Sequence, residues 1–429
     1  MPVFTSSIEV TADYPTIKPS LNLNFARSRS LDPRITFTRA SVGTYVGRDG
    51  LIKTAGNDEA RFDHDPVTLE SLGLLIEESR TNSIAYSDGI GGGWGGNGVS
   101  LTTINSVNGP DGIAGVTEIR DNTGSSYHAA FYGTVPVDGS SSYTVSAWLK
   151  KGPNYRSDIG SGGRFQIYCS RGTAIPASIQ ITFDFDTLVG QNNVNSSSIT
   201  QYPNGWIRVT FTFISNAAAN VTPHFLLGNG GEYQGDATNS VYIWGAQVEQ
   251  GSFPTSYIPT SGSAVTRAAD EGNITGDAFS SFYNTTEGVL QTEFSRIGSV
   301  YNQMVVQFKD SDGSERIEIR GQGGSNDSFR MEVIEGGATS GQEYSFSSGG
   351  VVANVVGQFA KVNLAYKQND FASTINGTLA SIDNAGDVGV CDRVGIGYAN
   401  YGIGYNGHIK NIIYYPKRLT NTQLQLLTS

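Results

Sequence analysis

Two predicted strands carry aromatic residues at positions where alternation predicts a polar face. In the stretch 143–151, the apolar residues Tyr143, Val145, Ala147 and Leu149 alternate with a second set that includes Trp148 and Lys150. In the stretch 165–169, Gln166 and Tyr168 alternate with apolar residues in the same way. Successive side chains of a strand point to opposite faces of its sheet. A tryptophan on a polar face is unusual enough to need a cause.

Sugar binding is one such cause. A flat ring covers the apolar C–H face of a pyranose, while neighbouring polar groups bond its hydroxyls. We therefore expect a glycan-binding surface whose candidate residues are Trp148, Tyr168, Gln166, Lys150, Gln180, Arg208 and Asp184. The alternative is structural, with Trp148 packed against a loop, another domain or a second subunit.

Candidate metal ligands are few. Asp310, Asp312 and Glu315 surround a glycine in a predicted hairpin turn and could belong to a calcium loop, although a full loop supplies more oxygen ligands. The run 63–65 (Asp-His-Asp) lies on a predicted strand, so its side chains alternate and cannot all hold one ion. We expect these acids to pair with nearby arginines instead, namely Arg34, Arg39, Arg61 or Arg80.

Catalytic motifs are not found. The sequence has no H-E-x-x-H, no G-x-S-x-G and no glycine-rich phosphate loop. A glycan-cleaving sandwich needs two neighbouring carboxylates. Asp184 and Asp186 share a strand face and come nearest to such a pair, whereas Glu318 and Glu332 each stand between apolar neighbours. We expect a protein that is not an enzyme and needs no cofactor, calcium being the one cation considered.

The composition of the 429 residues fits an all-β protein. Charged residues make up 16%, aromatic residues 10%, and there are 54 glycines; low charge with many turn formers and aromatics is typical of extracellular or virion β-proteins. The net charge of −11 argues against nucleic acid and anionic membranes as partners. We expect no secretion signal, no membrane-spanning run and no disulfide, since Cys169 and Cys391 fall in different predicted domains.

Strand patterns and turn residues divide the chain into an N-terminal β-rich block followed by two antiparallel β-sandwiches. The stretch 44–53 has a hairpin signature with Asp49-Gly50 at its turn, and the C-terminal stretch is expected to form a short helix starting near Thr420. The expected divisions are an extended arm (1–20), a β-rich docking block (21–82), a jelly roll (83–259), a linker strap (260–269) and a second sandwich (270–429).

Several motifs resemble those of tailed-bacteriophage virion proteins. The block 21–82 contains F-T-R-A-S, T-Y-V, A-R-F-D-H-D-P and G-L-L-I-E-E-S-R-T-N, and it resembles a segment that precedes lectin-like domains in phage tail and head-appendage proteins. The stretch 242–267, with W-G-A-Q-V-E-Q-G and S-Y-I-P-T-S-G, resembles a closing segment of phage virion proteins. The middle region is similar to carbohydrate-binding-module jelly rolls, and 270–429 resembles the laminin-G/concanavalin-A-like lectin fold.

The resemblance implies a tail fibre or related appendage in the virion, assembled in the host cytoplasm and released by lysis. Its N-terminal region would dock onto other virion proteins, and its lectin-like domains would face host surface glycans. A homo-oligomer of open copy number is expected. One alternative is a capsid decoration or head-fibre protein that binds only virion proteins, and another is a polysaccharide depolymerase.

Overall fold

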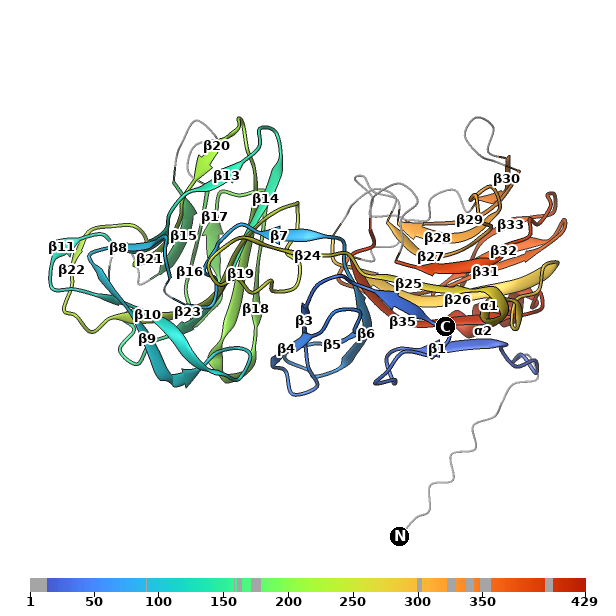
Figure 1. Cartoon of the computed structure of the whole chain (residues 1–429), viewed down its shortest axis with the longest axis horizontal. Helices are drawn as coiled ribbons and strands as arrows, with labels where there is room; N and C mark the ends of the chain where they lie inside the picture. The colour runs from blue at the N-terminus through green and yellow to red at the C-terminus, as the bar shows by residue number, and fades with distance from the viewer. Residues whose placement is uncertain are drawn as a thin grey trace, which may run out of the picture.

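The chain is described from a computed structural model, which confirms the predicted all-β fold class. The described residues are 14–89, 91–157, 159, 164–170, 179–298, 303–321, 329–336, 343–347, 356–397 and 404–429. The first thirteen residues of the predicted N-terminal arm lie outside them. Figure 1 shows two lobes joined by a small blue region that contains β3 to β6.

The middle lobe is a sandwich of two six-stranded antiparallel sheets. The first sheet has the order β18 (Ser196–Gln201), β19 (Ile207–Ile214), β14 (Ser142–Lys151), β23 (Ser240–Gln250), β10 (Ala114–Asp121) and β9 (Val99–Asn108). The second has the order β17 (Gly190–Asn192), β16 (Ile179–Phe183), β15 (Phe165–Cys169), β21 (Pro223–Leu227), β12 (His128–Tyr132) and β8 (Trp94–Asn97). The smaller elements are β11 (Ser125–Ser126) with β22 (Tyr233–Gln234), β13 (Val135–Val137) with β20 (Ala219–Val221), and a 3-10 turn at Pro203–Gly205.

Alternating apolar residues build the core between these two sheets. Val145, Ala147 and Leu149 of β14 face Phe165 and Ile167 of β15 inside one buried cluster. Strands with one apolar face form such a sandwich because pairing two apolar faces removes both from water.

The C-terminal lobe is a second sandwich. One sheet has the order β33 (Thr378–Asp383), β32 (Phe371–Ile375), β31 (Ala360–Lys367), β26 (Glu287–Arg296), β35 (Gly407–Tyr415), β6 (Ser71–Ile76) and β5 (Arg61–His64), and β1 (Leu21–Asn24) also pairs with β35. The opposing sheet has the order β2 (Thr36–Thr38), β25 (Glu271–Thr275), β34 (Arg393–Ile396), β27 (Met304–Lys309), β28 (Arg316–Gly321), β29 (Phe329–Glu335) and β30 (Glu343–Ser347). The remaining elements are the ribbons β3 (Gly43–Val46) with β4 (Ile52–Ala55) and β7 (Arg80–Asn82) with β24 (Val265–Arg267), and helices α1 (Gly276–Ser280) and α2 (Asn421–Thr428).

Two local predictions are confirmed. Val46 pairs with Ile52 across the predicted hairpin turn, where Gly50 adopts a φ of +74° that a side chain would disfavour. Helix α2 begins at a capping box in which the Thr420 hydroxyl accepts a hydrogen bond from the Gln423 backbone N–H and the Gln423 side chain accepts one from the Thr420 backbone N–H. Among the described residues, no helix is long and apolar enough to cross a bilayer.

The N-terminal block does not stand apart from the second sandwich. β1 and β6 pair with consecutive parts of one edge of β35, at residues 411–414 and 407–409 respectively. β2 extends the opposing sheet through β25. Periodicity predicts that such strands exist. It cannot predict that β1 and β6 pair with β35, because β35 lies more than 300 residues later in the chain and no local pattern identifies it.

A buried ionic cluster ties this block to the second sandwich and to the segment between β23 and β24 (residues 251–264), which is called the strap from here on and begins before the predicted linker. Arg61 of β5 bonds Glu77 at 2.6 Å and also pairs with Asp270, which precedes β25. Arg39 reaches the other oxygen of Asp270 at 2.9 Å. Ser256 of the strap donates to Glu77 from both its backbone nitrogen and its hydroxyl, each at 2.7 Å. The side chains of all four charged residues are at most 1% exposed.

Breaking this cluster should destabilise the fold strongly. Asp270→Asn removes a carboxylate that two buried guanidinium groups share, so we expect the free energy of unfolding to fall by about 3–5 kcal/mol. Urea unfolding measures the change. Asp186→Asn is the control, because Asp186 forms an exposed pair with Lys151 and such pairs contribute about 0–1 kcal/mol. Equal effects of the two substitutions would contradict a stabilising role of the cluster.

The same cluster should make stability sensitive to acid. Burial alone would raise the pKa of Glu77, but Arg267, Arg61 and the Ser256 hydrogen bonds outweigh it and hold the pKa well below its usual range. A carboxylate whose pKa is lower in the folded state stabilises the fold at pH values above its unfolded-state pKa. This stabilisation is lost progressively as the pH falls from the unfolded-state pKa toward the folded-state pKa. Unfolding experiments between about pH 5 and pH 3 should therefore show a larger loss of stability in the native chain than in Glu77→Gln. Equal losses would contradict this assignment.

Candidate functional site

The structure divides the predicted glycan-binding residues between two opposite faces. Trp148 and Lys150 lie on β14, and Arg208 is the direct cross-strand partner of Trp148 on β19. Gln166 and Tyr168 lie on β15, which belongs to the other sheet of the sandwich. Both sets point away from the shared core, so they face opposite sides. The expectation of one common surface is therefore wrong, because alternation gives a residue's face but does not assign its strand to a sheet.

Trp148 is covered and not presented to solvent. Its side chain is 1% exposed and packs edge-on against Trp244 and Tyr257. The Arg208 guanidinium lies over its ring, 4.4 Å from the centroid. Gly245 makes this packing possible, since it has a φ of +63° and a Cβ there would lie 2.7 Å from the indole. Trp148 therefore follows the structural alternative given above, in which it packs against another part of the chain.

The cover is the strap, and its motif residues hold it in place. Gln247 accepts a hydrogen bond from the Ile258 backbone at 2.9 Å, and Glu249 accepts two from Thr255. Tyr257 then packs on Trp244 with 4.4 Å between ring centroids. The polar residues of the W-G-A-Q-V-E stretch therefore fasten the strap across the outer face of β14 and β23.

A cavity of about 170 Å³ remains between this face, the strap and the β3–β4 hairpin. Trp148, Tyr202 and Arg208 form one wall. Tyr45 of the hairpin and Asp63 of β5 line the N-terminal side. Tyr45, Tyr202 and Arg208 are each partly exposed, so the cavity reaches solvent. Its volume is comparable with that of one sugar unit or a small group of water molecules.

Two buried N–H donors lie next to this cavity. Among the described residues, Nε1 of Trp148 and Nε of Arg208 are buried and form no hydrogen bond of good geometry, although the indole N–H lies near the Tyr202 hydroxyl and acts to lower its pKa. Burial raises the pKa of Tyr202 to about 12, so its hydroxyl stays protonated at neutral pH. Two N–H donors beside a neutral hydroxyl and aromatic rings can bind a molecule rich in hydroxyl oxygens.

The opposite face offers a weaker platform. Tyr168 stacks on His224 at 4.4 Å with 12° between the ring planes. Each ring covers one face of the other, so His224 takes up one of the two faces that Tyr168 could offer to a sugar. Burial lowers the pKa of His224 to about 4, so its ring is neutral near pH 7. Gln166 is buried and donates to Thr182.

The remaining predicted residues have local roles. Asp184 follows β16 and accepts hydrogen bonds from the backbone of Asp186 and Thr187, so it shapes a turn. Lys150 is partly exposed at the end of the Trp148 face, and Gln180 faces Tyr168 across β15 and β16. Tyr202 was missed because it lies outside a strand and has no alternation to mark its face.

The candidate calcium loop is a hydrogen-bonded turn. Asp312 accepts from the Ser314 backbone, and Asp310 accepts from the Ser314 hydroxyl and the Glu315 backbone. The side chain of Glu315 accepts instead from Gly336 of another segment. In the part of the chain that the structure describes, no three His, Cys, Asp or Glu side chains gather as a metal site.

Two expectations about acidic residues are wrong. Asp63 bonds the Val46 backbone and His408 of β35, and Asp65 bonds the backbone of Val67, so neither pairs with an arginine of the described segments. The four arginines proposed as partners instead bond Asp32, Asp270, Glu77 and Glu78. The prediction failed because Asp63 bonds His408, which is distant in the sequence and could not be identified from it.

Glu318 and Glu332 were expected to stand alone, but they are direct cross-strand partners on β28 and β29. Both are buried, and Arg320 bridges them at 3.1 and 2.8 Å. Burial and the neighbouring Glu332 raise the pKa of Glu318 in spite of the nearby arginines. A buried, arginine-bridged pair is typical of a structural ion network, because its oxygens are already engaged.

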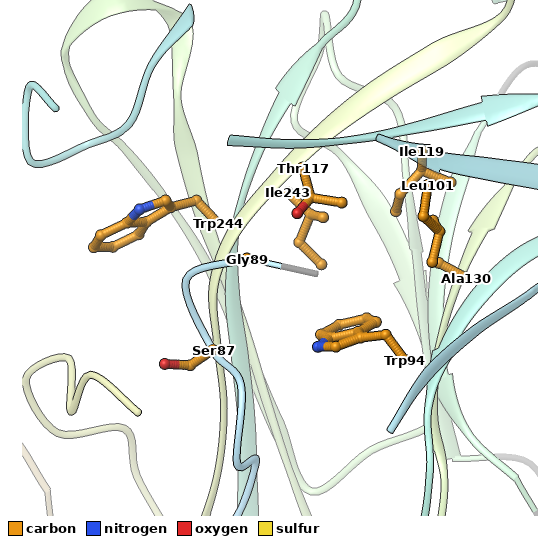
Figure 2. A pocket seen from close by; sticks show the side chains of 9 residues that line it. All are labelled: Ser87, Gly89, Trp94, Leu101, Thr117, Ile119, Ala130, Ile243 and Trp244. Carbon is orange, nitrogen blue, oxygen red and sulfur yellow. The ribbon is translucent and has the colours of Figure 1, made fainter. Parts of the chain in front are cut away.

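A small, mostly apolar pocket in the middle sandwich is lined by Ser87, Gly89 and Trp94 of β8, among others (Figure 2). Trp94 lines it, donates its indole N–H to Tyr86 at 2.8 Å, and packs on Tyr132 and Phe225. Figure 2 shows Trp94 and Trp244 on either side of the segment that carries Ser87 and Gly89. A volume of about 10 Å³ leaves room for little more than one water molecule.

Comparisons with known proteins give only distant likenesses. No protein-family model and no curated protein matches the chain. Domain 4 of AbnA, an arabinanase from Geobacillus stearothermophilus, in complex with arabinotriose, matches with a TM-score of 0.31 and 12% identity over 42% of this chain and 83% of that chain. The CBM40 of the Ruminococcus gnavus IT-sialidase, bound to α2,3-sialyllactose, matches with a TM-score of 0.29 and 12% identity over 34% and 84%.

Mouse laminin α1 domains LG4-5 match over 79% of this chain and 94% of that chain, with a TM-score of 0.23 and 10% identity. The matched structures thus include carbohydrate-binding modules and laminin-G domains. These scores are too low to transfer a function, so function is argued below from the side chains of this chain.

The buried position of Trp148 predicts different effects for two substitutions. Trp148→Ala leaves a large hole under Tyr257 and Trp244, so the free energy of unfolding should fall by about 3–5 kcal/mol. Trp148→Phe keeps a ring in place and should cost clearly less. Tyr168→Ala, on the opposite and partly exposed face, is the comparison. Urea unfolding in which Trp148→Ala costs no more than Tyr168→Ala would contradict the packed position of Trp148.

Proposed function

We propose that the chain is a non-enzymatic glycan-binding protein whose site is the cavity between the middle sandwich, the strap and the N-terminal block. The observation that carries this proposal is a cavity of about 170 Å³ lined by aromatic rings, beside which the buried donors Nε1 of Trp148 and Nε of Arg208 form no hydrogen bond of good geometry with the described residues. Leaving a buried donor without an acceptor is costly, so such groups usually have an occupant. A sugar supplies acceptor oxygens together with an apolar C–H face for the rings.

The size and wall chemistry favour one terminal or branching sugar unit. The walls combine the rings of Trp148, Tyr202 and Tyr45 with few charged groups, which suits a polyhydroxylated ligand. Asp63 can accept hydrogen bonds from sugar hydroxyls, although its two oxygens already serve Val46 and His408. A single small site binds weakly, so useful adhesion would depend on several copies.

In biological context, we propose a bacteriophage virion adhesion protein, of tail-fibre or related appendage type. The motifs in 21–82 and 242–267 support this proposal by their resemblance to phage virion segments. Other virion proteins would be partners of the N-terminal region, and copies of the chain would associate in the virion. Release by host lysis would bring such a protein to its target.

A capsid decoration or head-fibre protein that binds only virion proteins is the second candidate. The covered position of Trp148 favours it, since a flat, exposed sugar platform is not present on that sheet face. This candidate predicts that the cavity holds water only.

The first test is sugar binding by the full chain. Trp148→Phe and Tyr202→Phe each remove one hydrogen-bonding group and keep a ring, so each should weaken binding of a glycan found by array screening by about 3- to 10-fold. Isothermal titration calorimetry measures the affinity. Tyr168→Phe, on the opposite face, is the matched control and should bind normally. A glycan that binds all four proteins equally would place the site elsewhere, and no binding by the folded chain would favour the decoration protein.

A further inference from the structure

The N-terminal block carries a basic groove, although the whole chain is acidic. The groove has a volume of about 930 Å³ and lies between the loop that follows β1, the β3–β4 hairpin and the edge strand β5. Arg27 and Arg29 line it from the loop, and Arg48 and Lys53 line it from the hairpin. Figure 1 shows the loop at the end of β1 turned toward β4 and β5. Asp49 is the only acidic residue among the lining side chains, against a net charge of −11 for the chain.

Three of these cations lack an acidic partner. Asp49 pairs with Lys53 at 2.8 Å, whereas Arg27, Arg29 and Arg48 form no ion pair within the described residues. All three are exposed. Most other described arginines pair with a carboxylate, for example Arg34, Arg120, Arg393 and Arg418. Unpaired guanidinium groups gathered around one groove in an acidic protein indicate a place for an external anion.

The lining also has an apolar component. The rings of Tyr45 and Phe62 are partly exposed in the groove, and Leu69 at its rim is 46% exposed. Guanidinium groups bind carboxylates and sulfates in a bidentate manner, and rings cover the C–H faces of sugars. We infer that this groove binds an acidic polysaccharide, with uronate carboxylates or sulfates on Arg27, Arg29 and Arg48 and sugar rings against Tyr45 and Phe62.

This site is separate from the cavity, and the inference does not depend on the function proposed for that cavity. Tyr45 stands between the two and lines both. Nucleic acid is a poorer fit, because the unpaired cations are confined to one short groove, whereas binding a phosphate backbone relies on cations spread along an extended face. An acidic protein segment is the competing occupant, and the experiment below separates it from a polysaccharide.

The test compares the full chain with Arg27→Gln/Arg29→Gln/Arg48→Gln. A matched control, Lys18→Gln/Lys367→Gln/Lys417→Gln, removes three exposed cations outside the groove. Calorimetry would measure binding of polygalacturonate, heparin, neutral dextran and poly-L-glutamate. We expect the native chain and the control to bind polygalacturonate or heparin, and the arginine variant to bind at least about tenfold more weakly, which corresponds to about 1.4 kcal/mol. Added salt should weaken the binding.

Each other outcome overturns the inference. Poly-L-glutamate bound as tightly as the polysaccharide would identify an acidic protein segment as the occupant, and dextran bound equally would exclude recognition of charge. Equal loss in the arginine variant and in the control would show a general charge effect. No binding of any polyanion by the folded native chain would also refute the site. A glycan that binds in the cavity should still bind the arginine variant normally, which separates a failure here from a failure of the cavity proposal.

Discussion

The structure depends on the buried ionic cluster of Arg39, Arg61, Glu77 and Asp270. Charges out of water are tolerated only when each has partners in good geometry, and removing one partner leaves an uncompensated charge. The four residues come from the N-terminal block and from the start of the second sandwich, and Ser256 adds the strap. These segments can therefore not separate without leaving buried charges unpaired, and they behave as one unit.

This unit determines which parts of the middle sandwich's outer face are accessible to a ligand. The strap, fastened by Gln247 and Glu249, lies across the outer face of β14 and buries Trp148. The β3–β4 hairpin closes the same region from the other side, which leaves a cavity in place of an open sheet face. The basic groove on the far side of Tyr45 is built from the same hairpin and from β5. Both proposed sites thus depend on segments that the ionic cluster holds together.

Local patterns predicted much of the fold, and distant pairings account for most of the errors. Alternation placed Val145, Ala147 and Leu149 in the core correctly, and the turn at Gly50 and the cap at Thr420 follow from side-chain chemistry within a few residues. Alternation also placed Trp148 on the outer face of its sheet, but an outer face contacts solvent only where no other segment covers it. The strap, the partner of Asp63 and the pairing of Glu318 with Glu332 are set by tertiary contacts that no local pattern encodes.

The most direct test of the account is a crystal structure of the full chain soaked with a glycan that it binds. The account predicts electron density for one sugar unit in the cavity, with oxygens accepting hydrogen bonds from Nε1 of Trp148 and Nε of Arg208. Ordered water alone in the cavity, with the sugar bound on another surface, would contradict the proposed site and leave the cavity as a hydrated junction between domains.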